Sequence, residues 1–267
     1  MKFVISMIVS LLFFLSAQES NQLILHQAHS HNDYEHNKPL ITALDHGFKS
    51  VEVDILLWNG KLYVGHDHID IIKGQMLDKL YLEPLYSLFT KNNGYIYNNE
   101  APLILLVDVK TSAEETFQRL DIVLKDYRDM LTKFDNGHLV NGAVTIILSG
   151  NRPDIDLIFN TDTRYVFIDG RLENVGKNID NNVMPLISID WADEFDWNGK
   201  GDFPESELNN LKSITNKVHS EGKMLRFWGS PDNVEAWELL DQIGVDLINT
   251  DKIKMFYEHF AEDLKNN

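Results

Sequence analysis

Short apolar segments alternate with amphipathic ones along most of this chain, and this alternation restricts its possible folds more than any other feature. The apolar segments are rich in β-branched residues and have the length of single strands. There are eight: Leu23–His29, Ser50–Trp58, Leu103–Lys110, Ala143–Ser149, Tyr165–Asp169, Met184–Asp190, Met224–Trp228 and Asp246–Asn249. Helical patterns lie between most of them, over Pro39–His46, Leu82–Lys91, Ala113–Leu131, Pro204–His219, Val234–Ile243 and Ile253–Leu264. Strands that alternate with helices in this way predict a parallel sheet.

Eight such units in 267 residues fit one TIM-type (β/α)8 barrel, an α/β fold of about 250 residues. We expect a somewhat irregular barrel, because Gly150–Thr161 and Gly170–Val183 carry little helical pattern. The alternative is an open doubly wound sheet, but no Gly-rich phosphate loop follows the first strand. No linker divides the chain, so residues 18–267 are predicted to form one domain.

The first residues have the pattern of a signal peptide. Lys2 precedes the apolar run Phe3–Leu15, and Ser16-Ala17-Gln18 offers a cleavage point after small residues. The run is short for a bilayer span, although a membrane-anchoring helix is the alternative. We therefore predict a signal peptide over residues 1–17, export to a periplasmic or secreted location, and no stable membrane anchor after cleavage.

The composition excludes several classes of function. A formal charge of −17 argues against nucleic acid as a partner, because phosphates require a basic surface. It also disfavours electrostatic docking on anionic lipid. The chain has no cysteine, which excludes disulfides, thiolate metal sites and a cysteine nucleophile.

Polar side chains stand at the ends of all eight predicted strands, where the active sites of such barrels form. Glu52 and Asp54 lie two residues apart on one strand, so their side chains share a face. Asp108 and Lys110 repeat this spacing on the next strand. Carboxylates that converge at a barrel mouth predict a site for a divalent metal, Mg²⁺ or Ca²⁺. An ion-pair network with Lys110 is the alternative, but it would leave excess negative charge.

His29 and His66 are the candidate acid and base, because a histidine pKa near neutrality suits both proton transfers at a phosphodiester. His31 could replace His29, since it shares a strand face with it if the strand continues. His36 and His68 are weaker candidates, and His26, His46, His138, His219 and His259 are interpreted as structural or surface residues.

The segment Ser50–His66 predicts a hairpin around Asn59-Gly60. A two-residue turn would pair Trp58 with Lys61 and place His66 opposite Val53. A three-residue loop with Gly60 left-handed would pair Leu57 with Lys61 and place His66 opposite Glu52, and we expect this second form.

Several motifs together resemble the PLC-like phosphodiesterase superfamily, which includes glycerophosphodiester phosphodiesterases, sphingomyelinase D and phosphatidylinositol-specific phospholipase C. They are Ala28-His29-Ser30-His31-Asn32, Ser50-Val51-Glu52-Val53-Asp54, Val64-Gly65-His66-Asp67, Leu106-Val107-Asp108-Val109-Lys110-Thr111, and the closing segment Gly244–Asp251. Trp228 stands where the superfamily has a tryptophan on its seventh strand. The resemblance spans roughly residues 23–255, and the opening is similar to that of the altered-inheritance-of-mitochondria subgroup.

This resemblance implies a metal-dependent phosphoric diester hydrolase acting on a glycerophosphodiester or another small-molecule or lipid phosphodiester. His29 and His66 would be its acid/base pair and Lys110 its phosphate contact. Glu52, Asp54 and Asp108 would bind the metal, and Asn32, Trp228 and Asn249 would contact substrate. Three features depart from the glycerophosphodiesterase pattern: Ser30 replaces an arginine, Asp108 replaces a glutamate, as in sphingomyelinase D, and Tyr34–Pro39 replaces the Glu-Asn-Thr that follows the first motif.

Two other functions compete with this hypothesis. His29-Ser30-His31 also opens metal-dependent amidohydrolase-type barrels, but those need histidines on later strands, and the fourth, fifth and sixth strands end without one. A non-catalytic barrel that only binds a ligand is the other alternative. Trp228 and Trp191 could line the mouth, or either could be a core tryptophan.

Overall fold

The computed structural model describes residues 23–97, 102–159 and 162–266, and they form a closed (β/α)8 barrel. Its parallel strands are β1 (Leu25–Ser30), β2 (Phe48–Trp58), β4 (Leu103–Val109), β7 (Val144–Gly150), β9 (Val166–Gly170), β10 (Leu186–Asp190), β11 (Met224–Trp228) and β12 (Leu247–Thr250). β1 pairs with both β12 and β2, which closes the ring. All eight strands overlap the predicted segments, so the predicted TIM-type barrel is confirmed. The predicted signal peptide, residues 1–17, lies outside the described residues.

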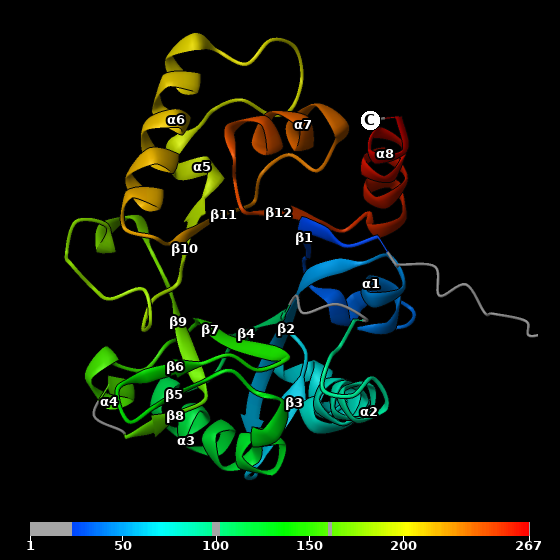
Figure 1. Cartoon of the computed structure of the whole chain (residues 1–267), viewed down its shortest axis with the longest axis vertical. Helices are drawn as coiled ribbons and strands as arrows, with labels where there is room; N and C mark the ends of the chain where they lie inside the picture. Colours follow the sequence, from blue (N-terminus) through cyan, green and yellow to red (C-terminus); the bar gives the residue numbers. More distant parts are fainter. Residues whose placement is uncertain (1–22, 98–101, 160–161, 267) are drawn as a thin grey trace, which may run out of the picture.

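Helices cover the outside of the barrel (Figure 1). Their bounds are α1 Ile41–Asp45, α2 Glu83–Lys91, α3 Ala113–Leu124, α4 Ile155–Phe159, α5 Trp191–Glu194, α6 Glu205–Ser220, α7 Val234–Ile243 and α8 Ile253–Asn266. Within the described ranges, no helix has the length and apolar character needed to span a bilayer. The two connections that lack helical pattern hold only the short α4 and the 3-10 turn Leu172–Asn174, so the expected irregularity is present.

Residues alternate between the two sides of the barrel wall, and this alternation separates two cores. Residues such as Val51, Val53 and Ile55 point outward into the larger core under the helices, where each is fully buried. The smaller core fills the lower part of the barrel interior and consists of Ile104, Leu106, Ile147, Phe167, Leu186 and Leu247. Each buried side chain of this size contributes about 1.5–3 kcal/mol to the free energy of folding. This core therefore stabilises the barrel wall that carries the polar side chains at the mouth.

A small sheet that the sequence did not predict lies beside the barrel near α4 (Figure 1). It consists of β5 (Lys133–Asp135), β6 (His138–Val140) and β8 (Thr163–Arg164), all antiparallel. These strands have two or three residues each, too few for an alternating pattern to be recognised. Arg164 packs its guanidinium 4.0 Å from the Phe134 ring centre and so joins the sheet through a cation–π contact.

The hairpin after β2 differs from the prediction. Trp58 pairs with Lys61, the first pair of β3 (Lys61–Val64), so the turn has two residues and not three. Asn59 and Gly60 have φ values of +47° and +71°, the left-handed pair that a type I′ turn requires. A type I′ turn matches the right-handed twist of the two strands. The three-residue loop that we expected is therefore not formed. His66 nevertheless reaches the catalytic face, because β3 ends at Val64 and the chain turns at Gly65.

Candidate active site

Three carboxylates meet at the C-terminal ends of the barrel strands. Glu52 and Asp54 point inward from β2, and Asp108 comes from β4, in register with Asp54. One oxygen atom of each lies within 4.8 Å of the others. Glu52 and Asp54 are almost completely buried, because the strands place them on the inner face of the wall. The predicted clustering of these carboxylates therefore matches the geometry.

Two cations face this cluster. The Lys110 ammonium lies 3.1 Å from Asp54 Oδ2 and 3.1 Å from Asp108 Oδ1. Arg226 donates to Glu52 Oε2 from β11, across the barrel. Burial would raise the pKa of Glu52, but the Arg226 guanidinium and the hydrogen bond from His29 lower it well below its usual range.

The negative charge of the carboxylate cluster favours the binding of a further cation. Burial, together with the charges of Asp54 and Glu52, raises the pKa of Asp108 to about 6 despite Lys110. Asp54 Oδ1 is buried and has no hydrogen-bond partner among the described residues. An unpaired buried carboxylate oxygen costs free energy unless a cation contacts it. A set of hard oxygen donors in this state fits Mg²⁺ or Ca²⁺.

His29 lies beneath this cluster and is fully buried. Its Nδ1 is 2.7 Å from Ser50 Oγ, and its Nε2 is 3.0 Å from Glu52 Oε2. Burial and the Arg226 charge lower its pKa to about 4. Both ring nitrogens are therefore engaged, and the ring holds Glu52 in place.

His66 lies at the surface of the mouth, with 57% of its side chain exposed. Its Nδ1 is 2.7 Å from Asp54 Oδ2, so its Nε2 is directed away from the carboxylate. Gly65, with φ +149°, allows the tight approach of Asp70, whose Oδ2 accepts from the His66 backbone N–H at 2.9 Å.

His31 follows β1 and is arranged in the same way as His66. Its Nδ1 is 2.8 Å from Asp251 Oδ1, and 31% of its side chain is exposed. Burial lowers the pKa of His31, but the hydrogen bond to Asp251 and the charge of Glu52 outweigh that effect and raise it. The mouth thus has two partly exposed imidazoles, each held through Nδ1 by a carboxylate.

The three predicted substrate contacts differ from one another in their position and exposure. Trp228 is 38% exposed at the end of β11, as a residue lining the mouth would be. Asn249 is buried, and its Oδ1 accepts from Arg226 Nε at 2.8 Å, so it supports the cluster from within. Asn32 has φ +44° in the loop after β1, and its Oδ1 lies 3.4 Å from Tyr34 Oη. Trp191 is a core residue, 3% exposed.

The sequence places Arg226 among the polar residues at the strand ends but predicts no role for it, and it does not predict Tyr34 as part of the site. Tyr34 donates from its hydroxyl to Asp54 Oδ2 at 2.9 Å, and both side chains are buried. For Arg226 a signal existed: it alternates on β11 with Leu225 and Phe227, which pack into the outer core, so it must point inward, and a buried arginine requires an acidic partner. Tyr34 lies in a loop, where no periodicity gives the direction of a side chain.

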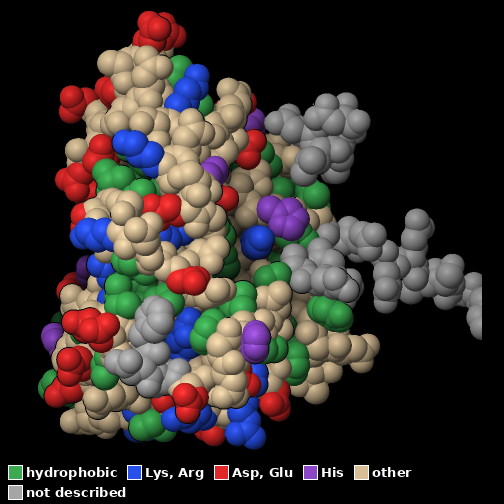
Figure 2. Space-filling view, turned by 60° about the vertical axis from the view of Figure 1, so that its left-hand side comes forward, with side chains coloured by type: hydrophobic (Ala, Val, Ile, Leu, Met, Phe, Trp, Pro, Cys, Tyr) green, Lys and Arg blue, Asp and Glu red, His purple; other side chains and the backbone are tan. Residues whose placement is uncertain are grey.

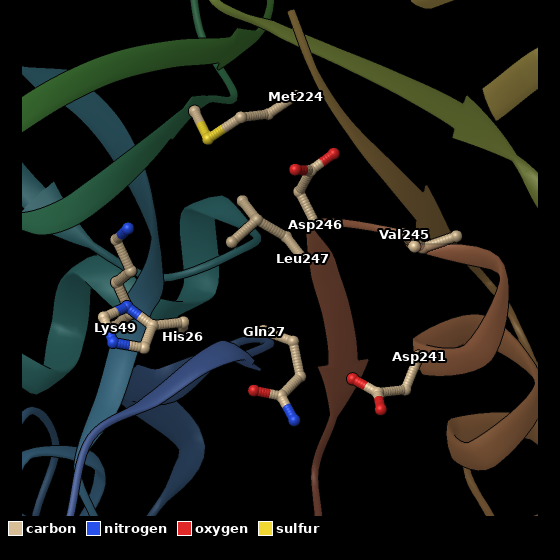
Figure 3. Close-up of a pocket in the computed structure, with 9 residues that line it drawn as sticks. His26, Gln27, Lys49, Met224, Asp241, Val245, Asp246 and Leu247 are labelled. Carbon is tan, nitrogen blue, oxygen red and sulfur yellow. The ribbon is translucent and has the colours of Figure 1, made fainter. Parts of the chain in front are cut away.

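A separate cavity of about 310 Å³ lies at the opposite, N-terminal ends of β1, β11 and β12 (Figure 3). Its lining includes His26, Lys49 and Asp246, which Figure 3 shows around the opening. Burial and the Lys49 charge lower the pKa of His26. Active sites of these barrels lie at the other end, so this cavity does not belong to the candidate site.

Comparison with known proteins identifies the family of this barrel. A family model described as the AIM6-like phosphodiesterase domain matches residues 18–169, more than half of the chain and all three clustered carboxylates. The chain belongs to the AIM6-like phosphodiesterase family. The predicted resemblance to PLC-like phosphodiesterases, and to this subgroup in particular, is therefore confirmed.

Relatives of this AIM6-like chain extend along most of its length. It is 30% identical to altered inheritance of mitochondria protein 6 of Eremothecium gossypii, in a match that covers 86% of this chain and 68% of that protein. It is 27% identical to a homologue from Arthroderma benhamiae, over 87% of this chain and 83% of the homologue. A solved glycerophosphodiester phosphodiesterase from Parabacteroides distasonis superposes with a TM-score of 0.53 at 14% identity, covering 88% of this chain and 98% of its own. That likeness shows the shared barrel fold.

Proposed function

We propose that this AIM6-like chain is a metal-dependent phosphoric diester hydrolase acting on a glycerophosphodiester or phospholipid-type substrate. One observation carries the proposal: the buried carboxylates Glu52 and Asp54 and the half-buried Asp108 converge from two adjacent strands, beside a lysine and two partly exposed histidines. Membership of a phosphodiesterase family supports the reaction class.

Glu52, Asp54 and Asp108 would hold the metal. A divalent ion bound there supplies positive charge to the phosphoryl oxygens and lowers the pKa of a hydroxyl that it contacts. Among the protein's own groups, Lys110 contributes a point charge beside the cluster, suited to one phosphate oxygen.

Local cations have to attract the anionic phosphate, because the chain as a whole carries a formal charge of −17. Figure 2 shows acidic side chains spread over the face in view rather than gathered in one patch. Lys110 lies beside the cluster with part of its side chain exposed, whereas Arg226 is buried next to Glu52, where burial strengthens its electrostatic effect.

We assign the acid and base roles to His66 and His31. Each is partly exposed and has its ring fixed through Nδ1 by a carboxylate, so its Nε2 would be the nitrogen that exchanges a proton with the substrate. His29, which the sequence analysis preferred, has both nitrogens engaged and is fully buried, so we propose that it positions Glu52 instead. One histidine would take the proton of the attacking hydroxyl, and the other would protonate the leaving alcohol.

The attacking oxygen would come from water or from a hydroxyl next to the phosphate within the substrate. In the second route a bond forms between that oxygen and phosphorus, and the bond from phosphorus to the leaving alcohol breaks, giving a cyclic phosphate. A well-aligned neighbouring hydroxyl can contribute up to about 7–11 kcal/mol through its effective molarity.

The test is hydrolysis of a phosphodiester panel by the purified protein, with and without chelator. We expect turnover that chelator removes and added Mg²⁺ or Ca²⁺ restores. Asp54→Asn should lose activity and metal affinity together, whereas Asp45→Asn, an exposed aspartate on α1, should keep both. Full activity in excess chelator would rule out the metal. Metal binding with no turnover of any diester would leave a barrel that only binds a ligand.

The same panel separates the two routes of attack. Diesters with a hydroxyl adjacent to the phosphate should react much faster than matched deoxy analogues, with a cyclic phosphate visible by phosphorus NMR. Equal rates for the hydroxyl and deoxy diesters, with no cyclic phosphate, would exclude the intramolecular route and indicate direct attack by water.

We also propose that the protein is exported, on the strength of the apolar run Phe3–Leu15. N-terminal sequencing of the product from its native cell should begin near Gln18. An intact Met1 on a cytoplasmic product would contradict export.

A further inference from the structure

A groove of about 410 Å³ opens at the C-terminal ends of β9 and β10, across the mouth from the histidines. We call it the carboxylate groove; its polar lining consists of Arg171, Glu173, Ser188, Asp190, Asp193 and Glu194. The groove exists because β9 stops at Gly170, opposite Ile187. From Ser188 onward β10 pairs only with β11, which leaves its other edge open.

The carboxylate groove adjoins the candidate active site. Asp108 is in register with Ser149 on the neighbouring strand β7. The Ser149 hydroxyl donates to Asp169 Oδ2 at 2.7 Å, and Arg171 donates to the same carboxylate oxygen at 2.8 Å. A substrate with its phosphate beside Asp108 and Lys110 could therefore place a substituent in this groove.

Ser188 is an unused polar group in the wall of the carboxylate groove. The residue is completely buried by its neighbours, and its Oγ has no hydrogen-bond partner among the described residues. A hydroxyl in this state costs free energy unless a bound group pairs with it. It therefore points to a ligand that forms a hydrogen bond at this wall.

The charge of the groove indicates the type of ligand. Arg171 is neutralised by Asp169, with which it forms an ion pair. Glu173, Asp190, Asp193 and Glu194 have no ion-pair partner within 4 Å in the described part of the chain. Within the described residues, Asp190 Oδ1 accepts a hydrogen bond from the Ala192 backbone N–H, and Glu194 Oε2 accepts one from Asn210 Nδ2. Arg152 adds one positive charge that interacts with Glu173. The groove still carries excess negative charge, because Asp190, Asp193 and Glu194 remain.

These carboxylates are too dispersed for a metal ion. The one set of three carboxylates with ligand atoms within 4.8 Å of one another, in the ranges that the structure describes, is Glu52, Asp54 and Asp108. The groove also lacks an aromatic side chain in its lining, and aromatic faces are what quaternary ammonium groups require. A primary ammonium group has three N–H donors for carboxylate and hydroxyl acceptors.

We propose that the carboxylate groove binds a primary ammonium group on the alcohol part of the phosphodiester. The proposal rests on the proposed function, because it places the phosphate at Lys110. The substrate class is then a zwitterionic diester with its phosphate at the carboxylate cluster and its ammonium at Ser188 and the acidic side chains around it.

The test compares three glycerol phosphodiesters that differ only in the second alcohol: 2-aminoethyl, 2-(trimethylammonio)ethyl and 2-hydroxyethyl. We measure kcat/KM with metal present, and Kd by calorimetry in chelator, where no turnover is expected. The 2-aminoethyl diester should be preferred over both others by about fivefold to tenfold, as expected for one or two partly exposed charge contacts. The preference should shrink at high salt.

Two variants locate the effect. Asp193→Asn removes an exposed groove charge and Ser188→Ala removes the buried hydroxyl. Each should reduce the amine preference, the ratio of kcat/KM for the 2-aminoethyl diester to kcat/KM for the 2-hydroxyethyl diester, by about twofold to threefold. Glu262→Gln, an exposed position on α8, makes the same charge change as Asp193→Asn away from the groove and should keep the full preference.

The outcomes separate this proposal from the function on which it rests. Equal kcat/KM and equal Kd for all three diesters would overturn the groove assignment while hydrolysis stands. A quaternary diester that binds as tightly as the primary amine would also overturn it. If no diester is hydrolysed but the 2-aminoethyl diester binds best and loses that advantage in Asp193→Asn, the groove stands and the hydrolase fails.

Discussion

At the residue scale, the position of the Asp108 carboxylate depends on a glycine. Gly150 ends β7 with φ +66°, and a Cβ atom at this position would lie 2.1 Å from Asp108 Oδ1. No side chain fits there without displacing the carboxylate. The left-handed backbone adds a second reason for glycine at this position.

We predict that Gly150→Ala weakens divalent-metal binding at least tenfold and destabilises the fold by about 1–3 kcal/mol, the cost of a strained backbone position. Calorimetric metal titration and urea unfolding measure the two effects. Gly137→Ala is the matched control, since Gly137 also has positive φ, +84°, but its Cβ would meet nothing within 4 Å. Gly137→Ala should lose stability but keep its affinity for metal. Normal metal binding by both variants would mean that the close approach of Gly150 to Asp108 does not affect the metal site.

The pair of His31 and Asp251 should make stability depend on pH. The raised pKa of His31 means that its contribution is complete below its unfolded pKa of about 6.5 and disappears as pH rises through the folded value. Mainly because of the hydrogen bond from His31, the pKa of Asp251 is lowered, so its contribution disappears as pH falls below about 4. The pair therefore stabilises the fold between these limits.

Asp251→Asn should consequently cost the most stability between about pH 4 and 6.5, and little at pH 9. The difference should be below about 1 kcal/mol, because 31% of the His31 side chain and 65% of the Asp251 side chain are exposed. Urea unfolding at pH 5.5 and 9 measures it, with the exposed Asp126→Asn as control. A cost that does not change with pH would show that the pair is not ionic.

At the element scale, the connection from β1 to α1 is held by one buried carboxylate. Asp33 is completely buried and accepts hydrogen bonds from Ser30 Oγ at 2.8 Å, from Tyr81 Oη at 2.9 Å and from the Leu40 backbone N–H. Leu40 has φ +63°, a rare value for leucine, with its side chain fully buried. The same connection carries His31 and Tyr34, so Asp33 fixes both.

Asp33→Ala should destabilise the fold by about 3 kcal/mol or more, because it removes three bonds to a carboxylate and leaves buried donors without partners. Urea unfolding measures the loss, and Asp45→Ala, exposed at the end of α1, should cost less than about 0.5 kcal/mol. An equally small loss of unfolding free energy in both variants would mean that Asp33 is not required to hold the Leu40 backbone at positive φ.

At the scale of the whole molecule, the barrel carries a polar layer above an apolar one. The lower layer around Leu106 and Phe167 stabilises the closed ring, whereas Glu52, Asp54 and Asp108 place like charges close together. Part of that repulsion is offset by Lys110 and Arg226. A bound divalent cation would offset more of it and should stabilise the whole fold.

We predict that Mg²⁺ or Ca²⁺ raises the melting temperature of the protein and that chelator lowers it again. At one hundred times Kd the gain should be about 2.7 kcal/mol, since the ion binds only the folded chain. Asp54→Asn should abolish the shift in a thermal melt, and Asp45→Asn should keep it. A melting temperature that no tested divalent ion changes would contradict metal binding at this site.

The eight strands, most helices and the face on which Glu52, Asp54 and Asp108 lie could be predicted from the amino-acid pattern, because periods of two and 3.6 residues are local properties of the chain. Which histidine is buried and which is exposed could not be predicted in this way. His29 and His31 share one pattern but contact different partners in the folded chain, Glu52 and Asp251. The pairing of Arg226 with Glu52 joins residues 174 positions apart. Such contacts depend on how the barrel closes, and closure is a property of all eight strands together.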